Sequence, residues 1–192
     1  MLKLIAKGIL RIGGWTAVGE RPEFNKAIFV VAPHTSNWDG IWALAFVVSI
    51  GMEVHFFAKK SLFAFPLGIV LRVLGGIPLD RDVPGSAARQ AVDAFNEHDT
   101  FYLGLAPEGT RSHRPHWKSG FYRIAKGAGV PVVFGFLDYG NKRIGIGPSI
   151  ELSDDRSADM AKIREFYATI TGRWPEKTSP VIFPGDPRDG RG

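Results

Sequence analysis

The sequence predicts an α/β protein with a mostly parallel central sheet, helices on both faces of that sheet, and an amphipathic helix at the N-terminus. Two observations predict this class. Short apolar runs, which are typical of buried strands, alternate along the chain with longer segments of helical periodicity. The chain has 192 residues, of which 45% are hydrophobic and 22% are charged, a balance typical of one globular domain with a sizeable core.

Composition divides the chain into three parts. Residues 1–24 read as an amphipathic segment and a polar linker, and residues 25–172 carry the alternating pattern of the globular domain. Residues 173–192 are rich in proline, glycine and charge. Such a composition rarely buries enough apolar surface to order a chain, so we expect this last part to be poorly ordered.

Residues 1–15 are predicted to form a short amphipathic helix. Lys3, Lys7 and Arg11 recur every four residues and share one side of it. The apolar side is formed by Leu2, Ile5, Ile9 and Ile12. Two interpretations are open: the helix docks on the core and leaves its basic side in water, or it lies in a membrane interface.

The globular part is expected to alternate strands with helices. Strands are predicted at 27–31, 53–58, within 75–81, and at 100–105, 130–138 and 142–147. Helices are predicted at 37–50, 86–97, 119–127 and 155–171, the last as a surface helix that closes the domain. The run at 62–71 is apolar nearly all round, so it is either core or membrane-facing, and we expect core packing.

The first candidate site is the stretch PHTSNWD at 33–39, which follows the first expected strand. On one continuous helix His34 and Asp39 would lie ~140° apart, so they can converge only if His34 precedes the helix. Pro33 and the capping preference of Ser36 place the helix start at Asn37. Histidine is the usual general base near neutral pH, and a carboxylate can orient it. The alternative is a capping box, in which Asp39 only satisfies backbone donors.

The second candidate site is the loop PEGTRS that follows the strand at 100–105. Gly109 permits a close backbone approach, and the planar guanidinium of Arg111 fits a phosphate group, so the loop resembles an anion site. The alternative is an ordinary loop with a Glu108–Arg111 ion pair. His34, Arg81 and Arg111 each follow an expected strand, and the carboxyl ends of parallel strands share one edge, so one crevice could hold all three.

Charge and the remaining motifs limit the functional classes. A net charge of +5 suits an anionic substrate, an anionic membrane surface or nucleic acid, without choosing among them. The absence of cysteine excludes thiolate metal sites and a cysteine nucleophile. His113 and His116 make a weak metal site, because Pro115 breaks the helix that would align them and no third ligand is evident. No apolar stretch reaches the about 18 residues that a spanning helix needs.

These blocks, in this order, resemble the glycerolipid acyltransferases typified by 1-acylglycerol-3-phosphate acyltransferase. The H-x4-D block of that family is present from His34 to Asp39, and its block ending in Asp-Arg is present at 80–81. Its PEGTRS block is complete at 107–112, and its Val-Pro strand start is present at 130–131. The H-x4-D block alone is a weak signal, whereas PEGTRS downstream in the right order is a strong one.

The resemblance implies an O-acyltransferase of phospholipid biosynthesis. Such an enzyme moves a fatty acyl group from acyl-CoA or acyl carrier protein to the free hydroxyl of a lysophospholipid, here most simply 1-acylglycerol-3-phosphate. The resemblance gives His34 the role of general base and gives Asp39 the role of fixing its tautomer and orientation. The residues implied to hold the acceptor are Arg81, Glu108, Gly109, Thr110 and Arg111.

The resemblance also implies that the protein uses no metal or other cofactor and binds no nucleic acid. It places the protein on the cytoplasmic face of a membrane, as a peripheral or monotopic protein. Transfer is expected to be direct, because the chain has no cysteine and Ser36 lies at a helix cap. The alternatives are a lyso-aminolipid acceptor, a non-catalytic membrane-associated lipid-binding protein, and a hydrolase in which water replaces the acceptor.

Overall fold

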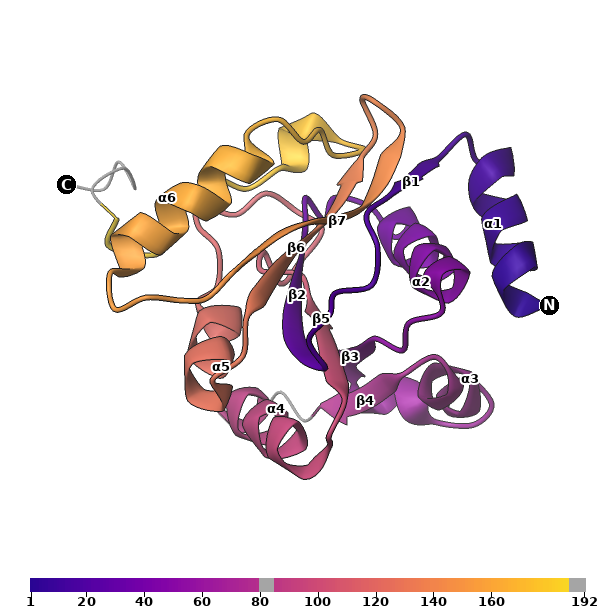
Figure 1. The fold of residues 1–192 in the computed structure, drawn as a ribbon, viewed down its shortest axis with the longest axis horizontal. Coiled ribbons are helices and arrows are strands. Elements are labelled where there is room, and N and C mark those ends of the chain that lie inside the picture. The colour runs from indigo at the N-terminus through magenta and orange to yellow at the C-terminus, as the bar shows by residue number, and fades with distance from the viewer. Residues whose placement is uncertain (80–84, 187–192) are drawn as a thin grey trace.

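The computed structural model describes residues 1–79 and 85–186, whose strands form one sheet flanked by helices (Figure 1). The strands are β1 (Thr16–Val18), β2 (Lys26–Ala32), β3 (His55–Lys59), β4 (Gly76–Leu79), β5 (Phe101–Leu105), β6 (Val132–Asp138) and β7 (Arg143–Ile150). The helices are α1 (Leu2–Ile12), α2 (Trp38–Ile50), α3 (Leu67–Val73), α4 (Ser86–Glu97), α5 (Gly120–Ala128) and α6 (Arg156–Tyr167). Two short 3₁₀ helices are η1 (Lys60–Phe63) and η2 (Pro175–Lys177).

The sheet confirms the predicted α/β class with a mostly parallel arrangement. Within the described residues it has seven strands in the order β1-β7-β6-β2-β5-β3-β4. The strands from β6 to β4 in that order pair in parallel, whereas β7 runs antiparallel to β6 and β1 runs parallel to β7. The carboxyl ends of β2, β5 and β6 therefore meet at one edge, and β2 lies between the other two.

The central strand β2 is buried on both faces, which explains its continuous apolar sequence. Ile28 and Val30 point into one hydrophobic cluster, and Ala27 and Phe29 point into another on the opposite face. All four side chains are at most 4% exposed. This packing fixes the register of β2 and hence the place where the chain leaves the sheet toward His34.

Helices cover both faces of the sheet, as predicted (Figure 1). Phe95 of α4, Phe121 of α5 and Ile163 of α6 belong to the cluster that covers the first face. Phe46 of α2 belongs to a cluster on the other face, together with residues of β6 and β7. Helix α1 lies outside α2 and adds Leu10 to that same cluster.

The segment at 1–24 is joined to the sheet, contrary to the expected division at residue 24. Thr16–Val18 forms β1, which pairs with Arg143–Gly145 of β7. Trp15 is 6% exposed and packs in the same cluster as α2. A strand of three residues is too short to show periodicity, and its conformation depends on the edge that β7 offers.

The expected disorder after residue 172 is wrong for residues 173–186. Phe183 is 3% exposed and lies in the main core cluster, and Ile182 is 6% exposed. Backbone hydrogen bonds tie the segment down, including one of 2.8 Å from Trp117 N to Ile182 O. The expectation rested on the average composition of the segment, in which these two apolar residues stand among prolines and charged residues. Burial of a few side chains is nevertheless enough to order a short segment. Residues 187–192 lie outside the described residues.

The expected core packing of the run at 62–71 is also wrong. Phe65 is 85% exposed and Ile69 is 55% exposed, whereas Phe63 is 9% exposed. The run forms η1 and α3 beside β4 at the edge of the sheet, where none of the described elements covers it. It therefore adds an apolar surface instead of core.

Candidate active site

His34 and Asp39 meet at the carboxyl end of β2. His34 lies in the loop that follows β2, and Asp39 lies in the first turn of α2, which begins at Trp38. Nδ1 of His34 is 3.2 Å from Oδ2 of Asp39. A carboxylate can only accept, so Nδ1 carries the proton and Nε2 is left as the basic nitrogen. The two side chains therefore meet as predicted, with His34 before the helix and Asp39 inside it.

The capping interpretation of Asp39 is correct as well. Its Oδ2 accepts hydrogen bonds from the backbone N of Thr35 and of Ser36, each at 2.8 Å. Ser36 Oγ accepts in turn from Trp38 N at 3.2 Å. The carboxylate thus serves the helix start and the histidine together, and the cap fixes the carboxylate relative to His34.

Burial and hydrogen bonding act against each other on Asp39, which is 1% exposed. Burial by itself raises the pKa of this carboxyl group, but hydrogen bonds from His34, Tyr139 and Ser36 bring the pKa below its usual value. Asp39 therefore stays ionised at neutral pH. The His34 side chain is 22% exposed, so a substrate hydroxyl can reach the imidazole.

Glu108 contacts the backbone of His34. It follows β5, the neighbour of β2, and its Oε2 accepts a hydrogen bond of 2.8 Å from His34 N. The residue is 2% exposed, and its Oε1 has no hydrogen-bond partner among the described residues. Burial raises the pKa of Glu108 to about 7, with the charge of Asp39 acting in the same direction and the His34 backbone bond against it. The observed contact of Glu108 is thus with the loop that carries the base.

The rest of the PEGTRS loop is open to solvent around Arg111. Gly109 has a φ of 66°, a left-handed conformation that favours glycine, and the flexible end of the Lys118 side chain lies beside it. Thr110 Oγ1 makes a long contact of 3.4 Å with Ser112 N. Arg111 of this loop and Lys118, whose side chain lies beside Gly109, therefore bring two cations to the segment that follows β5, the strand next to β2.

Two other candidates from the sequence are Arg81 and the pair His113 and His116. Arg81 lies outside the described residues. Nδ1 of His113 is 2.9 Å from the carbonyl oxygen of Thr178. Within residues 1–79 and 85–186, no three histidine, aspartate or glutamate side chains are grouped as a metal site would require.

Two contacts, one with Asp39 and one with the loop between β2 and α2, come from residues that sequence reasoning missed. The hydroxyl of Tyr139, directly after β6, donates to Oδ1 of Asp39 at 2.7 Å. Trp174 N donates to Thr35 Oγ1 at 3.2 Å. The available signal for Tyr139 was its place after a predicted strand, at the edge where His34 was also expected.

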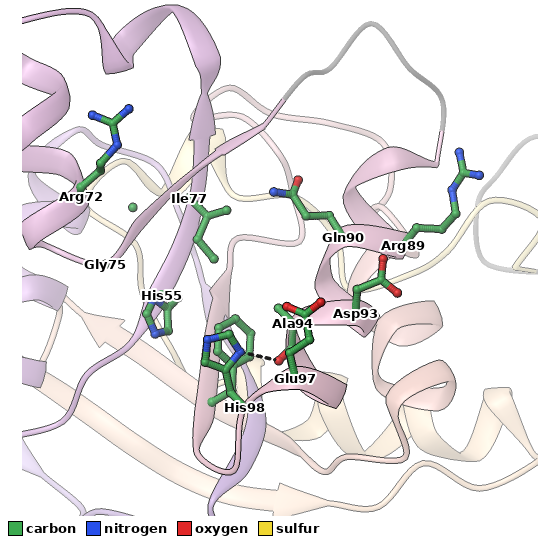
Figure 2. A pocket seen from close by; sticks show the side chains of 12 residues that line it. His55, Arg72, Gly75, Ile77, Arg89, Gln90, Asp93, Ala94, Glu97 and His98 are labelled. Atoms are coloured by element: carbon green, nitrogen blue, oxygen red, sulfur yellow. Dashed lines mark hydrogen bonds between the residues drawn. The ribbon is translucent and has the colours of Figure 1, made fainter.

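A pocket among the described residues lies at the other end of the sheet (Figure 2). Its volume is about 800 Å³, and it is lined by the amino ends of β3, β4 and β5 and by α4. His55 and His98 both border it, and each ring packs against Phe101. Because His34 follows the carboxyl end of β2, this pocket is not part of the crevice at the dyad.

The fold and the dyad together define an α/β protein equipped for general-base chemistry at a strand end. A sequence profile described as "Acyltransferase" matches residues 16–133, more than half of the chain. The chain belongs to this acyltransferase family, as the motifs predicted.

One solved structure supports the same fold. The chain is similar to the 1-acyl-sn-glycerophosphate (LPA) acyltransferase PlsC from Thermotoga maritima, with a TM-score of 0.57 and 21% sequence identity. The similarity covers 86% of this chain and 74% of that chain. No curated protein matches the chain in sequence.

Proposed function

We propose that this protein transfers a fatty acyl group from an acyl thioester to the free hydroxyl of a lysophospholipid, with 1-acylglycerol-3-phosphate as the acceptor. The thioester is carried by CoA or by acyl carrier protein. The observation that carries the proposal is the dyad: Nδ1 of His34 faces an ionised Asp39 at 3.2 Å, and its Nε2 is free to act as a base. Family membership supplies the class of reaction.

The proposed chemistry follows from this geometry. Nε2 of His34 takes the proton of the acceptor hydroxyl, and the oxygen of that hydroxyl bonds to the thioester carbonyl carbon. Collapse of the tetrahedral intermediate breaks the C–S bond, and the leaving thiolate receives the proton from His34. Asp39 stabilises the imidazolium that exists between these two steps. Because a thiolate leaves readily, activation and positioning of one hydroxyl are the main demands on the protein.

Phosphate recognition is the reason for choosing this acceptor. A desolvated phosphate needs several donors to replace its water, and two are available after β5, the neighbour of β2: Arg111 in the PEGTRS loop and Lys118, whose side chain lies beside Gly109. Arg81 is the further donor that the family resemblance implies. A lyso-aminolipid would place its charge differently and is the alternative acceptor.

Access to such an acceptor requires a membrane surface, and α1 supports that part of the proposal. Leu2 is 74% exposed, Ile5 53%, Ile9 43% and Ile12 90%, and these four residues are here called the α1 apolar strip. Among the described residues, no helix has both the length and the apolar character to cross a bilayer. We place the protein as a peripheral one, on the cytoplasmic face where acyl thioesters are available.

The function is tested with purified protein, a labelled acyl-CoA or acyl carrier protein, and a panel of acceptors. The panel contains lysophosphatidate, a monoacylglycerol, a lyso-aminolipid and no acceptor, with products identified by mass spectrometry. We expect a diacyl product with lysophosphatidate and little hydrolysis without an acceptor. Preference for the lyso-aminolipid would keep the acyl transfer and refute the phosphate, whereas release of free fatty acid alone would identify a hydrolase. No turnover with any pair would favour a non-catalytic lipid-binding protein.

A further inference from the structure

Tyr139 contacts the carboxylate of the dyad from a different part of the chain. Its hydroxyl lies 2.7 Å from Oδ1 of Asp39. Tyr139 follows β6, which is the parallel neighbour of β2, so it leaves the sheet at the same edge as His34. It lies 100 residues from Asp39 in sequence and belongs to none of the motif blocks.

The two oxygens of Asp39 have different partners. Oδ2 accepts from the backbone N of Thr35 and Ser36 and faces His34. Oδ1 accepts from Tyr139, whose hydroxyl is its hydrogen-bond donor among the described residues. Without this donor, one oxygen of a carboxylate that is 1% exposed would be buried without compensation. Tyr139 therefore fixes the rotation of the carboxylate and supports its ionised form.

Tyr139 is itself held in place before any substrate binds. Its backbone N donates to Thr171 O at 2.8 Å, and its ring packs edge-on against Trp15 with the centroids 4.8 Å apart. The cationic groups of Lys142 and Arg173 lie 5.8 and 6.0 Å from the ring centroid. A donor fixed in this way costs no reorganisation during the reaction.

The hydroxyl acts as a donor and keeps its proton. Burial and the hydrogen bond to Asp39 raise the pKa of Tyr139 well above its usual range, so tyrosinate does not form near neutral pH. Proton exchange with the substrate is therefore left to His34.

We propose that Tyr139 is a positioning residue for acyl transfer, which holds Asp39 in the orientation that aligns His34. The inference rests on the proposed function, because it takes His34 as the general base. Tyr139 acts through its contact with Asp39.

The first test is Tyr139→Phe, which removes the hydroxyl and keeps the packed ring. We expect kcat to fall about 10- to 100-fold, the scale of one hydrogen bond to a charged group, with little change in KM. The matched control is Tyr122→Phe on α5, whose hydroxyl donates to the buried Asp159 at 2.9 Å. The control loses the same kind of bond outside the dyad, so it should change thermal stability but not kcat.

The second test separates positioning from general destabilisation. If Tyr139 acts through Asp39, then Tyr139→Phe should change kcat by less than about twofold in an Asp39→Asn background, because coupled residues are not additive. An equal loss in both backgrounds, or wild-type kcat for Tyr139→Phe, would overturn the inference while leaving the acyltransferase intact. A wild-type protein without transfer activity would overturn the proposed function itself, and this inference with it.

Discussion

Asp39 illustrates how a single side chain combines two requirements at the residue scale. The same Oδ2 that caps the start of α2 through Thr35 N and Ser36 N also faces Nδ1 of His34. A non-catalytic protein could have the same helix cap. The cap alone, however, does not require that Nδ1 of a histidine lies 3.2 Å from the capping carboxylate. Because the helix start holds the carboxylate, the orientation of His34 is fixed by the fold and not by the substrate.

Replacement of the dyad residues should greatly reduce transfer without unfolding the protein. His34→Ala removes the base, and the loss of a general base typically costs ~10²–10⁴-fold in kcat. Asp39→Asn should be nearly as harmful, because the amide no longer fixes the Nδ1–H tautomer. Initial rates with lysophosphatidate, together with circular dichroism of each variant, measure both effects. Near-normal turnover by a folded His34→Ala protein would rule out the proposed mechanism.

Glu108 should give the protein a distinctive dependence of stability on pH. Its pKa is about 7 in the folded state and near 4.5 when unfolded, so between these values the folded protein binds a proton that the unfolded chain does not. The free energy of unfolding should therefore fall as the pH rises from 4.5 to 7. Glu108→Gln keeps an acceptor for His34 N and removes this titration.

We expect Glu108→Gln to match the wild type near pH 4 and to exceed it above pH 7 by about 3 kcal/mol, since one pKa unit is worth about 1.4 kcal/mol. Urea unfolding of both proteins at a series of pH values gives the difference. Other titrating groups cancel in that difference because both proteins carry them. A difference that does not change with pH would mean that Glu108 ionises normally in the folded protein.

Arg111 is the residue on which the phosphate part of the proposal depends. Arg111→Lys keeps the charge and loses the planar fork. It should therefore lower kcat/KM with lysophosphatidate, by an amount that corresponds to ~1.5–3 kcal/mol of lost transition-state stabilisation. The loss should be much smaller with an uncharged monoacylglycerol. Arg123→Lys, an exposed arginine on α5, is the control with the same chemical change. Equal losses on both acceptors would make Arg111 a structural residue.

At the scale of elements, the C-terminal segment acts as a strap that packs beside the active site. Trp174 N donates to Thr35 Oγ1 in the loop between β2 and α2, and Phe183 belongs to the main core cluster together with Phe121 of α5. The ring centroid of Phe183 lies 5.8 Å from that of Phe121, and the guanidinium of Arg156 lies 4.3 Å above the same ring. The segment therefore belongs to the folded unit that carries the dyad.

Phe183→Ala should destabilise the protein by about 3–5 kcal/mol, the usual cost of a cavity left by a buried aromatic ring. Phe65→Ala removes the same group from a side chain that is 85% exposed and should stay within about 0.5 kcal/mol of the wild type. Urea unfolding measures both variants. Equal, small effects would show that the segment from residue 173 is not part of the cooperative fold.

Local sequence patterns predicted most helices and strands, but they did not predict the long-range contacts. The expected helix at 86–97 matches α4, and α2 begins one residue after the expected start, because periodicity and capping are properties of neighbouring residues. The motifs likewise predicted that His34 and Asp39 converge, whereas the bond from His34 N to Glu108 was not expected. In contrast, β1 depends on the edge of β7, and the bonds from Tyr139 and Trp174 join residues at least 100 positions apart. Such pairings are decided by the packed fold and leave no local pattern.

At the scale of the whole molecule, apolar side chains remain exposed on two helices, α1 and α3. The α1 apolar strip and the outward side chains of α3 are exposed, and both helices lie on the right of the view in Figure 1, α1 beside α2 and α3 below them. Monomeric soluble proteins seldom leave such groups of apolar side chains in water. Ala6 and Leu10, each at most 4% exposed, hold α1 on the molecule, so its strip is free to face a bilayer.

This arrangement predicts binding to anionic vesicles through two separable contributions. The α1 apolar strip supplies burial, and the basic side of the same helix supplies attraction to anionic lipid, at about 1 kcal/mol per charge at most. Replacing Lys3, Lys7 and Arg11 together with glutamine should weaken binding and reduce its salt dependence. Ile5→Glu with Ile9→Glu should weaken binding also at high salt, because that change removes the apolar contribution.

Flotation of the protein with phosphatidylglycerol vesicles at 50 and 500 mM salt measures both effects. The control for the charge change is a triple glutamine variant at Arg123, Arg143 and Lys162, which are exposed on other elements and give the same net charge. That control should float as the wild type does. If the two triple variants lose binding equally, the attraction is a property of the net charge and α1 has no special place in it. If the Ile5/Ile9 variant floats as well as the wild type, the strip does not enter the bilayer and the membrane contact must be sought at α3.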